Sequence, residues 1–285
     1  MQKILVRILV WLGVMALLTV LAMGVWLVAF GGSQSTESLK WLQFLQMLGT
    51  FLLPPFICAW LWARSDALSW LRLDKGAEWQ QFALAVAIML CAVPGINLLA
   101  DLNSRVVLPE SLGFIEQIFK QQEEAAAALT ERFLQADTIG GLIINIGLMA
   151  LLPALAEELT FRGTLQQILT HRQSSIHIAI WVTAIVFSAI HMQFYGFVPR
   201  MLMGAMFGYI LVWSGSLWVP IMMHFTNNGL AVLVYYLSSN SEATQPYTSN
   251  IADTIGTGDT WWLGVLSLVI TCLGLLIFYR RTHKQ

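Results

Sequence analysis

The chain has 285 residues, of which 57% are hydrophobic and only 11% are charged. A soluble domain of this length would carry about 25% charged residues, so the composition excludes an ordinary soluble protein and indicates a polytopic protein of the lipid bilayer. A net charge of −1 argues against a nucleic-acid partner. The cysteines Cys58, Cys91 and Cys272 each lie in an apolar run without CxxC spacing, so we expect reduced, buried small hydrophobes rather than a disulfide framework.

Eight apolar runs approach the length of about 20 residues that a membrane-spanning helix needs. They cover about 8–30, 41–63, 80–100, 139–161, 177–195, 198–214, 217–238 and 260–279. The first run follows a basic start, as in a signal peptide, but it exceeds the core of about 7–15 residues typical of a signal peptide. We therefore expect an all-α integral membrane protein, a bundle of about eight transmembrane helices forming one domain, 1–285.

The distribution of lysine and arginine gives an orientation. Placing both termini in the cytoplasm leaves ten basic residues in cytoplasmic segments and five in outer segments, as the positive-inside rule requires. The ten are Lys3, Arg7, Arg64, Arg72, Lys75, Arg162, Arg172, Arg280, Arg281 and Lys284, and the five are Lys40, Arg105, Lys120, Arg132 and Arg200. The compact chain without a targeting extension favours a bacterial cytoplasmic membrane.

The segment 109–137, between the third and fourth runs, is polar but periodic. A spacing of three and four residues gives it one helical face, formed by Leu112, Ile115, Phe119, Gln122, Ala126, Leu129 and Phe133. We expect an amphipathic extramembrane helix lying on the membrane or on the other helices. The pattern leaves open whether this helix merely fills a loop or acts as a lid, and the topology places it opposite the cytoplasmic face.

Adjacent carboxylates and an arginine stand at the end of the fourth run, in the stretch "LLPALAEELTFRGTLQQ". An ionisable residue at membrane depth costs several kcal/mol and is a functional candidate. In a helix, Glu158 and Arg162 are four residues apart and can pair, whereas Glu157 is rotated by about 100° and stays free for another neighbour. The alternative is a structural pair that reaches the interface at a cytoplasmic helix end.

Two histidines lie within later apolar runs. His191 follows Phe187 by one turn inside the fifth run, and His224 shares a helical face with Asn228 in the seventh. Each could simply hydrogen-bond between helices, but a cavity open to the cytoplasmic side could bring both to Glu157. We expect no role for the remaining histidines, which lie in or near loops, or for the pair that continues the fourth run at the surface: His171, His177, His283, Gln166 and Gln167.

A carboxylate with histidines can activate water, directly or through a bound metal. A histidine and an asparagine on one helix face can donate hydrogen bonds to a developing oxyanion. This set of groups suits hydrolysis of a peptide bond. The sequence contains neither GxSxG nor HExxH, so neither a serine nucleophile on that pattern nor a zincin-type metalloprotease is supported.

Three motifs in order resemble those of a known family. "EELTFR" matches EExxxR, "FSAIH" matches FxxxH and "HFTNN" matches HxxxN. With this order and spacing, the chain resembles the CPBP family of intramembrane proteases, also called the Abi or type II CAAX protease family. The resemblance covers about 139–238, which would be the motif-bearing catalytic core, and the remaining spans match only as hydrophobic helices.

The resemblance implies a role for each motif residue. Glu157 would activate water with the help of His191, and His224 and Asn228 would stabilise the oxyanion. Glu158 and Arg162 would order the site, beside Phe187. Two mechanisms stay open: zinc with Glu157, His191 and His224 as candidate ligands, or a glutamate-activated water without metal.

The substrate class and the activity itself have alternatives. The substrate could be a prenylated CAAX-type protein, another peptide or another membrane protein, and the sequence leaves the oligomeric state open. A non-catalytic binding or immunity protein that sequesters a peptide or bacteriocin is the second hypothesis. A transporter or proton relay is the third, and it predicts an internal repeat that we do not find in the sequence.

Overall fold

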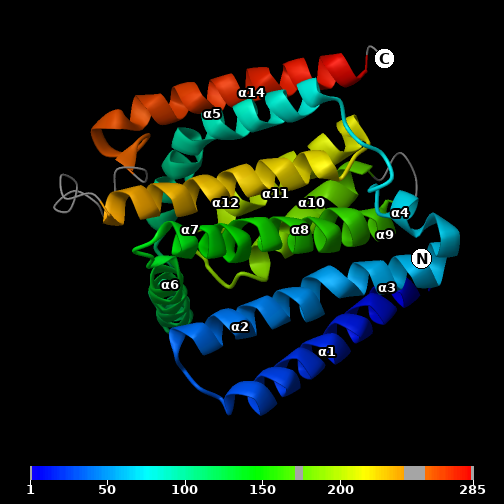
Figure 1. Cartoon of the computed structure of the whole chain (residues 1–285). Helices are drawn as coiled ribbons and strands as arrows, with labels where there is room; N and C mark the ends of the chain where they lie inside the picture. The colour runs from blue at the N-terminus through cyan, green and yellow to red at the C-terminus, as the bar shows by residue number, and fades with distance from the viewer. Residues whose placement is uncertain (1, 171–175, 241–253, 284–285) are drawn as a thin grey trace.

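The computed structural model describes residues 2–170, 176–240 and 254–283, and within these ranges the chain forms helices and no strand (Figure 1). The helices are α1 Gln2–Phe30, α2 Thr36–Gln46, α3 Leu53–Ala63, α4 Ala67–Trp70, α5 Trp79–Ser104, α6 Gly113–Leu134, α7 Ile139–Asn145, α8 Leu152–Glu158, α9 Gln166–Leu169, α10 Ile176–Ala189, α11 Phe197–Ser214, α12 Trp218–Ser239 and α14 Trp261–Thr282. The predictions for His171, Arg172 and Lys284 lie outside the described residues.

The helices run roughly alongside one another across the bundle. α14 packs on α5, α12 packs on α5 and on the α7–α8 rod, α10 pairs with α11, and α1 lies along α2 and α3. The described chain ends lie at one end of this bundle, whereas α6 crosses the other end (Figure 1). The predicted amphipathic helix is thus present as α6, and its position outside the bilayer stays a prediction.

Among the residues that the structure describes, six helical segments are long and apolar enough to cross a membrane: Lys3–Phe30, Thr36–Trp70, Trp79–Ser104, Ile139–Leu169, Phe197–Ser214 and Gly258–Thr282. The all-helical membrane fold is therefore supported, but the predicted count of eight is not confirmed. α10 has only 14 residues, about 21 Å of helix, which is short for a bilayer core of about 30 Å. α12 has 22 residues, but it carries the polar residues of the HxxxN motif.

Two of the spanning rods contain a π-helical turn directly before a proline-bearing helix start. The turn Met47–Leu52 precedes Pro54 and Pro55 in α3, and the turn Ile146–Leu151 precedes Pro153 in α8. A proline removes one backbone donor and crowds the carbonyl four residues earlier, and a wider turn accommodates this within a continuous rod. The rods therefore bend without breaking.

The fourth rod is longer than predicted. The fourth apolar run was expected to end near residue 161, but the helix continues through a third π-helical turn, Leu159–Leu165, to Leu169. The prediction that Gln166 lies at the surface is wrong, because its side chain is 1% exposed and Nε2 donates to the carbonyl of Gly208 at 3.2 Å. Polar residues in this stretch face protein rather than water, so they do not end the helix.

The cysteines differ from the expectation in one respect. Cys58 is buried, but Cys91 and Cys272 are exposed. Both lie on the two-helix layer of α5 and α14 at one face of the bundle (Figure 1). The sequence around Cys91 and Cys272 is apolar because both residues face outward, where a bilayer would surround the bundle, and not because they lie in a protein core.

Candidate active site

Glu158 and Arg162 form a fully buried ion pair at the centre of the bundle. Glu158 is the last residue of α8, and Arg162 lies in the π-helical turn that follows. Both side chains are 0% exposed, and Arg162 Nη1 donates to Glu158 Oε1 at 2.8 Å. Arg162 Nη2 also donates to the carbonyl of Gly204 on α11, at 3.1 Å. Arg162 thus binds a carboxylate and a backbone carbonyl of a neighbouring helix, and its side chain does not reach the surface of the bundle.

Two glycines of α11 allow this close approach. A Cβ at Gly204 would lie 3.2 Å from the Phe187 ring, and one at Gly208 would lie 2.8 Å from Gln166 Oε1. The carbonyls of these two glycines are the acceptors for Arg162 and Gln166. The spacing is GxxxG, a pattern that permits close helix packing in membranes, and it was the available sequence signal that α11 packs closely on other helices, here α10 and the rod with the EExxxR motif.

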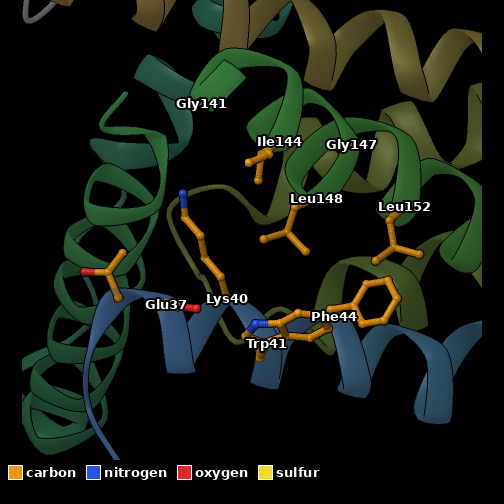
Figure 2. A pocket seen from close by; sticks show the side chains of 10 residues that line it. Glu37, Lys40, Trp41, Phe44, Gly141, Ile144, Gly147, Leu148 and Leu152 are labelled. Carbon is orange, nitrogen blue, oxygen red and sulfur yellow. The ribbon is translucent and has the colours of Figure 1, made fainter. Parts of the chain in front are cut away.

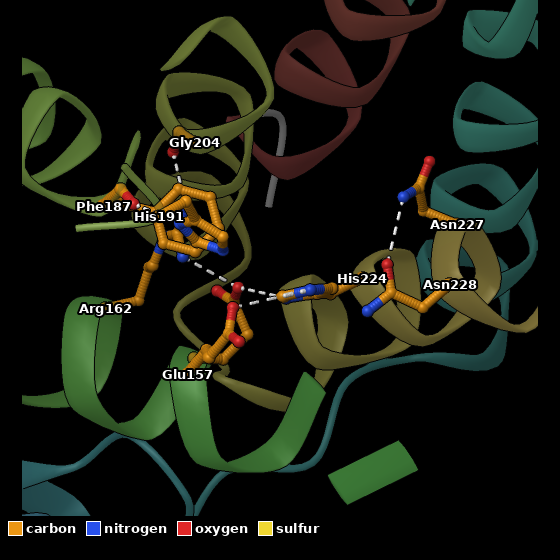
Figure 3. A network of polar contacts seen from close by, with 9 residues as sticks. Glu157, Arg162, Phe187, His191, Gly204, His224, Asn227 and Asn228 are labelled. Carbon is orange, nitrogen blue, oxygen red and sulfur yellow. Dashed lines mark hydrogen bonds and ion pairs between the residues drawn. The ribbon is translucent and has the colours of Figure 1, made fainter. Parts of the chain in front are cut away.

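His224 of α12 completes the cluster. Its Nδ1 lies 2.9 Å from Glu158 Oε1, the same oxygen that Arg162 contacts. Because an ionised carboxylate only accepts hydrogen bonds, the proton of the imidazole lies on Nδ1. Nε2 is then turned toward Glu157, whose Oε2 lies 3.9 Å away (Figure 3). Glu158 therefore orients the imidazole, and Glu157 faces its reactive edge.

Aromatic rings enclose the charged groups. The guanidinium carbon of Arg162 lies 4.5 Å from the centroid of the Phe187 ring and 5.3 Å from that of Phe207. The His224 ring stacks on Phe207 with centroids 5.5 Å apart. Cations over aromatic faces are attracted by the ring quadrupole, and the rings give the charged groups apolar surroundings. Electrostatic interactions inside this enclosure are therefore stronger than they would be at a surface.

His191 lies beside the cluster but not inside a helix. The sequence placed it within the fifth apolar run, whereas α10 ends at Ala189 and His191 begins the turn that leads to α11. Its Nδ1 is 2.8 Å from the carbonyl oxygen of Phe187, one of the last carbonyls of α10, which has no partner within the helix. Nδ1 is the donor in that bond, so Nε2 is free to contact a substrate or water. The Phe187 ring lies 5.1 Å from the ring of His191 and 6.2 Å from that of His224.

The turn that carries His191 packs against α6. Phe194 in this turn stacks on Phe119 of α6 with ring centroids 5.1 Å apart and planes 3° from parallel. This is the end of the bundle opposite the described chain ends (Figure 1). The expectation that the site opens on the side of the two termini therefore does not match the position of His191.

Asn228 lies one turn beyond His224 on α12, as the HxxxN spacing requires. Its Oδ1 accepts a hydrogen bond from Asn227 Nδ2 at 3.1 Å, which leaves the Asn228 Nδ2 group as a donor (Figure 3). It forms no hydrogen bond with the two carboxylates. The structure thus gathers Glu157, Glu158, Arg162 and His224 directly, with His191 and Asn228 at the edges.

Arg200, near the start of α11, is a residue that the sequence analysis did not single out. Its Nη2 donates to Gln193 Oε1 at 2.7 Å, and its Nη1 is buried without a hydrogen-bond partner among the described residues. Its positive charge interacts with the carboxylates of Glu157 and of Glu123 on α6. A basic residue nine positions after His191, where an apolar helix begins, was the signal available in the sequence.

The donor set does not fit zinc in this arrangement. Glu157 Oε2 and His224 Nε2 face each other, but catalytic zinc sites use three protein ligands. Within the described part of the chain, no group of three or more His, Cys, Asp or Glu side chains is placed to hold a metal ion. We therefore derive no chemical step through a metal.

Comparison with known proteins identifies the region that carries these residues. Residues 139–230 match the family described as type II CAAX prenyl endopeptidase Rce1-like. The uncharacterized protein YpbD of Bacillus subtilis (strain 168) is 32% identical over 87 residues, which are 29% of this chain and 41% of that protein. The chain thus covers less than half of that relative. No solved structure matches this chain. The family resemblance drawn from the three motifs is confirmed over this region.

Proposed function

We propose that this chain, which carries an Rce1-like domain of the type II CAAX prenyl endopeptidase family over residues 139–230, hydrolyses peptide bonds of membrane-associated proteins or peptides within the bilayer. One observation carries the proposal. Of two adjacent buried carboxylates, Glu158 is bound by Arg162 and His224, whereas Glu157 forms no hydrogen bond within the cluster and faces His224 Nε2. A purely structural ion pair would need only one of the two glutamates.

The geometry supports a division of labour between the carboxylates. Glu157 accepts a proton from water, whose oxygen attacks the carbonyl carbon of the scissile peptide bond. His191 Nε2, left free by the bond from Nδ1 to Phe187, holds that water. As the carbon–nitrogen bond breaks, the proton on Glu157 passes to the leaving amine. Each proton taken from water is thereby returned to the product.

The oxyanion of the tetrahedral intermediate requires donors. The Asn228 amide is one, and His224, whose ring Glu158 fixes, is the other when Nε2 also carries a proton. Prenylated proteins are one substrate class that the family name suggests. Another peptide or another membrane protein is the alternative substrate.

The test compares the purified wild type with Glu157→Gln and His191→Ala. Each is incubated with a membrane proteome fraction, and new peptide termini are mapped by mass spectrometry. We expect new termini with the wild type and a loss of about 100-fold or more with Glu157→Gln, because general-base catalysis contributes about 10²–10⁴-fold. Glu131→Gln, an exposed glutamate on α6, is the matched control and leaves the cleavage pattern unchanged.

Two outcomes would redirect the proposal. Identical termini for wild type and folded Glu157→Gln would contradict the catalytic role and favour the second hypothesis, a protein that binds and sequesters a peptide. Loss of cleavage after treatment with a metal chelator, and its return with zinc, would instead show that cleavage requires a metal ion. We expect cleavage to persist in the chelator.

A further inference from the structure

A second site lies on the other side of α8. A groove of about 830 Å³ separates α2 from the α7–α8 rod (Figure 2). Its walls are apolar, with Trp41 and Phe44 of α2 facing Ile144, Leu148 and Leu152. None of these side chains belongs to the polar cluster, so the groove needs an explanation of its own.

The groove runs from an end of the bundle into the apolar layer. The two spanning segments that form it begin at Thr36 and Ile139, and both run in the same direction (Figure 1). At 1.5 Å per residue, Lys40 lies about 6 Å and Phe44 about 12 Å beyond the start of α2. One end of the groove is therefore close to the membrane–water interface, and the other end is at hydrocarbon depth.

Two cations mark the interfacial end. Lys40 lines the groove, and its Nζ donates to Asn145 Oδ1 at 2.8 Å. Arg132, near the end of α6, donates from Nε to Thr36 Oγ1 at 2.8 Å and from Nη2 to the Gln34 carbonyl at 2.7 Å. All three acceptors are neutral. Within the described ranges neither cation has an ion-pair partner.

One carboxylate, that of Glu37, also borders the groove. It lies in the first turn of α2, where the helix dipole favours a negative charge. Figure 2 shows the Lys40 side chain reaching from α2 toward the start of α7, near Gly141. Together, Lys40, Arg132 and Glu37 give the rim of the groove a net charge of +1.

We propose that this groove binds an anionic glycerophospholipid, with an acyl chain along the apolar walls and the phosphate at Lys40 and Arg132. Such a lipid places its phosphate at the interface and its acyl chain in the hydrocarbon. The groove likewise has cations at its interfacial end and apolar walls beyond them. Glu157 is five residues, or about 140° of helix rotation, from Leu152. The lipid therefore lies on a different face of the rod from the polar cluster, and the proposal does not rest on peptidase activity.

The test measures lipid selectivity directly. Delipidated protein in detergent is titrated with dioleoyl phosphatidylglycerol or dioleoyl phosphatidylcholine, and bound lipid is counted by native mass spectrometry. These lipids share their chains and differ in net charge. We expect one phosphatidylglycerol bound about tenfold more tightly than phosphatidylcholine. Lys40→Gln and Arg132→Gln should each weaken phosphatidylglycerol binding about fivefold, the contribution of one basic residue near a membrane surface, while Lys40→Arg retains it.

Matched variants distinguish binding in the groove from non-specific electrostatic attraction of anionic lipid to the protein. Arg105→Gln removes the same charge from an exposed arginine paired with Asp101, and it should leave the affinity unchanged. Leu148→Trp fills the groove and should weaken binding of both lipids, with Ile144→Phe as the second variant if the first does not fold. Equal affinity of the wild type for both lipids, or an equal loss in Arg105→Gln and Lys40→Gln, would overturn the proposal.

Discussion

The polar cluster and the groove differ in how their charged side chains are paired. In the polar cluster, Arg162 and Glu158 are completely buried and contact each other directly. At the groove, Lys40 and Arg132 contact only neutral oxygens. A buried charge needs a partner, so the cluster is internally compensated, whereas the groove rim retains a charge for a ligand. The comparison predicts that the cluster is sensitive to mutation in the isolated protein and that the groove responds mainly when lipid is present.

The largest effect on stability is expected for Arg162→Met. This change leaves Glu158 buried without its cation, and breaking a buried pair costs about 3–5 kcal/mol. The free energy of unfolding, measured by denaturant titration in detergent, should fall by about that amount. Replacing both residues, as in Glu158→Gln with Arg162→Met, should cost less than Arg162→Met alone. A smaller loss in the single variant than in the double variant would contradict the compensation.

His224→Gln tests the imidazole that Glu158 orients. The amide can still contact Glu158, but it lacks the ring nitrogen Nε2 that faces Glu157, so we expect activity to fall about 100-fold. His177→Gln is the matched control, since that histidine is exposed and its Nδ1 lies 2.9 Å from the hydroxyl oxygen of Tyr209, away from the polar cluster. Activity measured by terminus mapping should be unchanged in the control. Equal losses in both variants would place the effect in the fold.

These predictions depend on contacts that sequence patterns give only in part. The four-residue spacing of Glu158 and Arg162 did predict their pairing, because neighbours at that spacing meet on a helix face. It could not show that His224, 66 residues later, shares the same carboxylate oxygen. That contact depends on how α12 packs on α8, which no local pattern encodes. The roles of the site residues stay predictions until activity is measured.

The same limit explains the errors in the element boundaries. Apolar runs indicate which segments avoid water, so the helical fold was predictable from composition. The run at 139–161 seemed to end where Arg162 and Thr164 appear, because side chains of that kind usually mark a loop. Here α11 supplies the Gly204 carbonyl to Arg162, and Thr164 donates to the Leu159 carbonyl at 3.0 Å. Because these polar side chains find partners on α11 and within the rod itself, they do not end the helix.

Arg200→Gln tests an intermediate case, a cation that is partly compensated. Arg200 Nη2 is held by Gln193, Nη1 has no partner among the described residues, and the charge interacts with Glu157. We expect a loss of activity of about tenfold, because one nearby charge is removed while Glu157 and His224 remain in place. Arg105→Gln, at an exposed ion pair, should retain full activity. No loss in Arg200→Gln would show that this charge does not act on the reaction.

The smallest effect is expected for Lys40→Met in lipid-free detergent. In the wild type, the flexible Lys40 side chain can move its ammonium group toward the interface. Its hydrogen-bond partner, Asn145, also donates from Nδ2 to the Leu134 carbonyl at 2.9 Å. The free energy of unfolding should change by less than about 1 kcal/mol, near the value of a single hydrogen bond. Adding phosphatidylglycerol should stabilise the wild type more than Lys40→Met, because a ligand stabilises only the state that binds it. A large loss without lipid would mean that Lys40 is already compensated within the bundle, and the two regions would then not differ in the way their charges are satisfied.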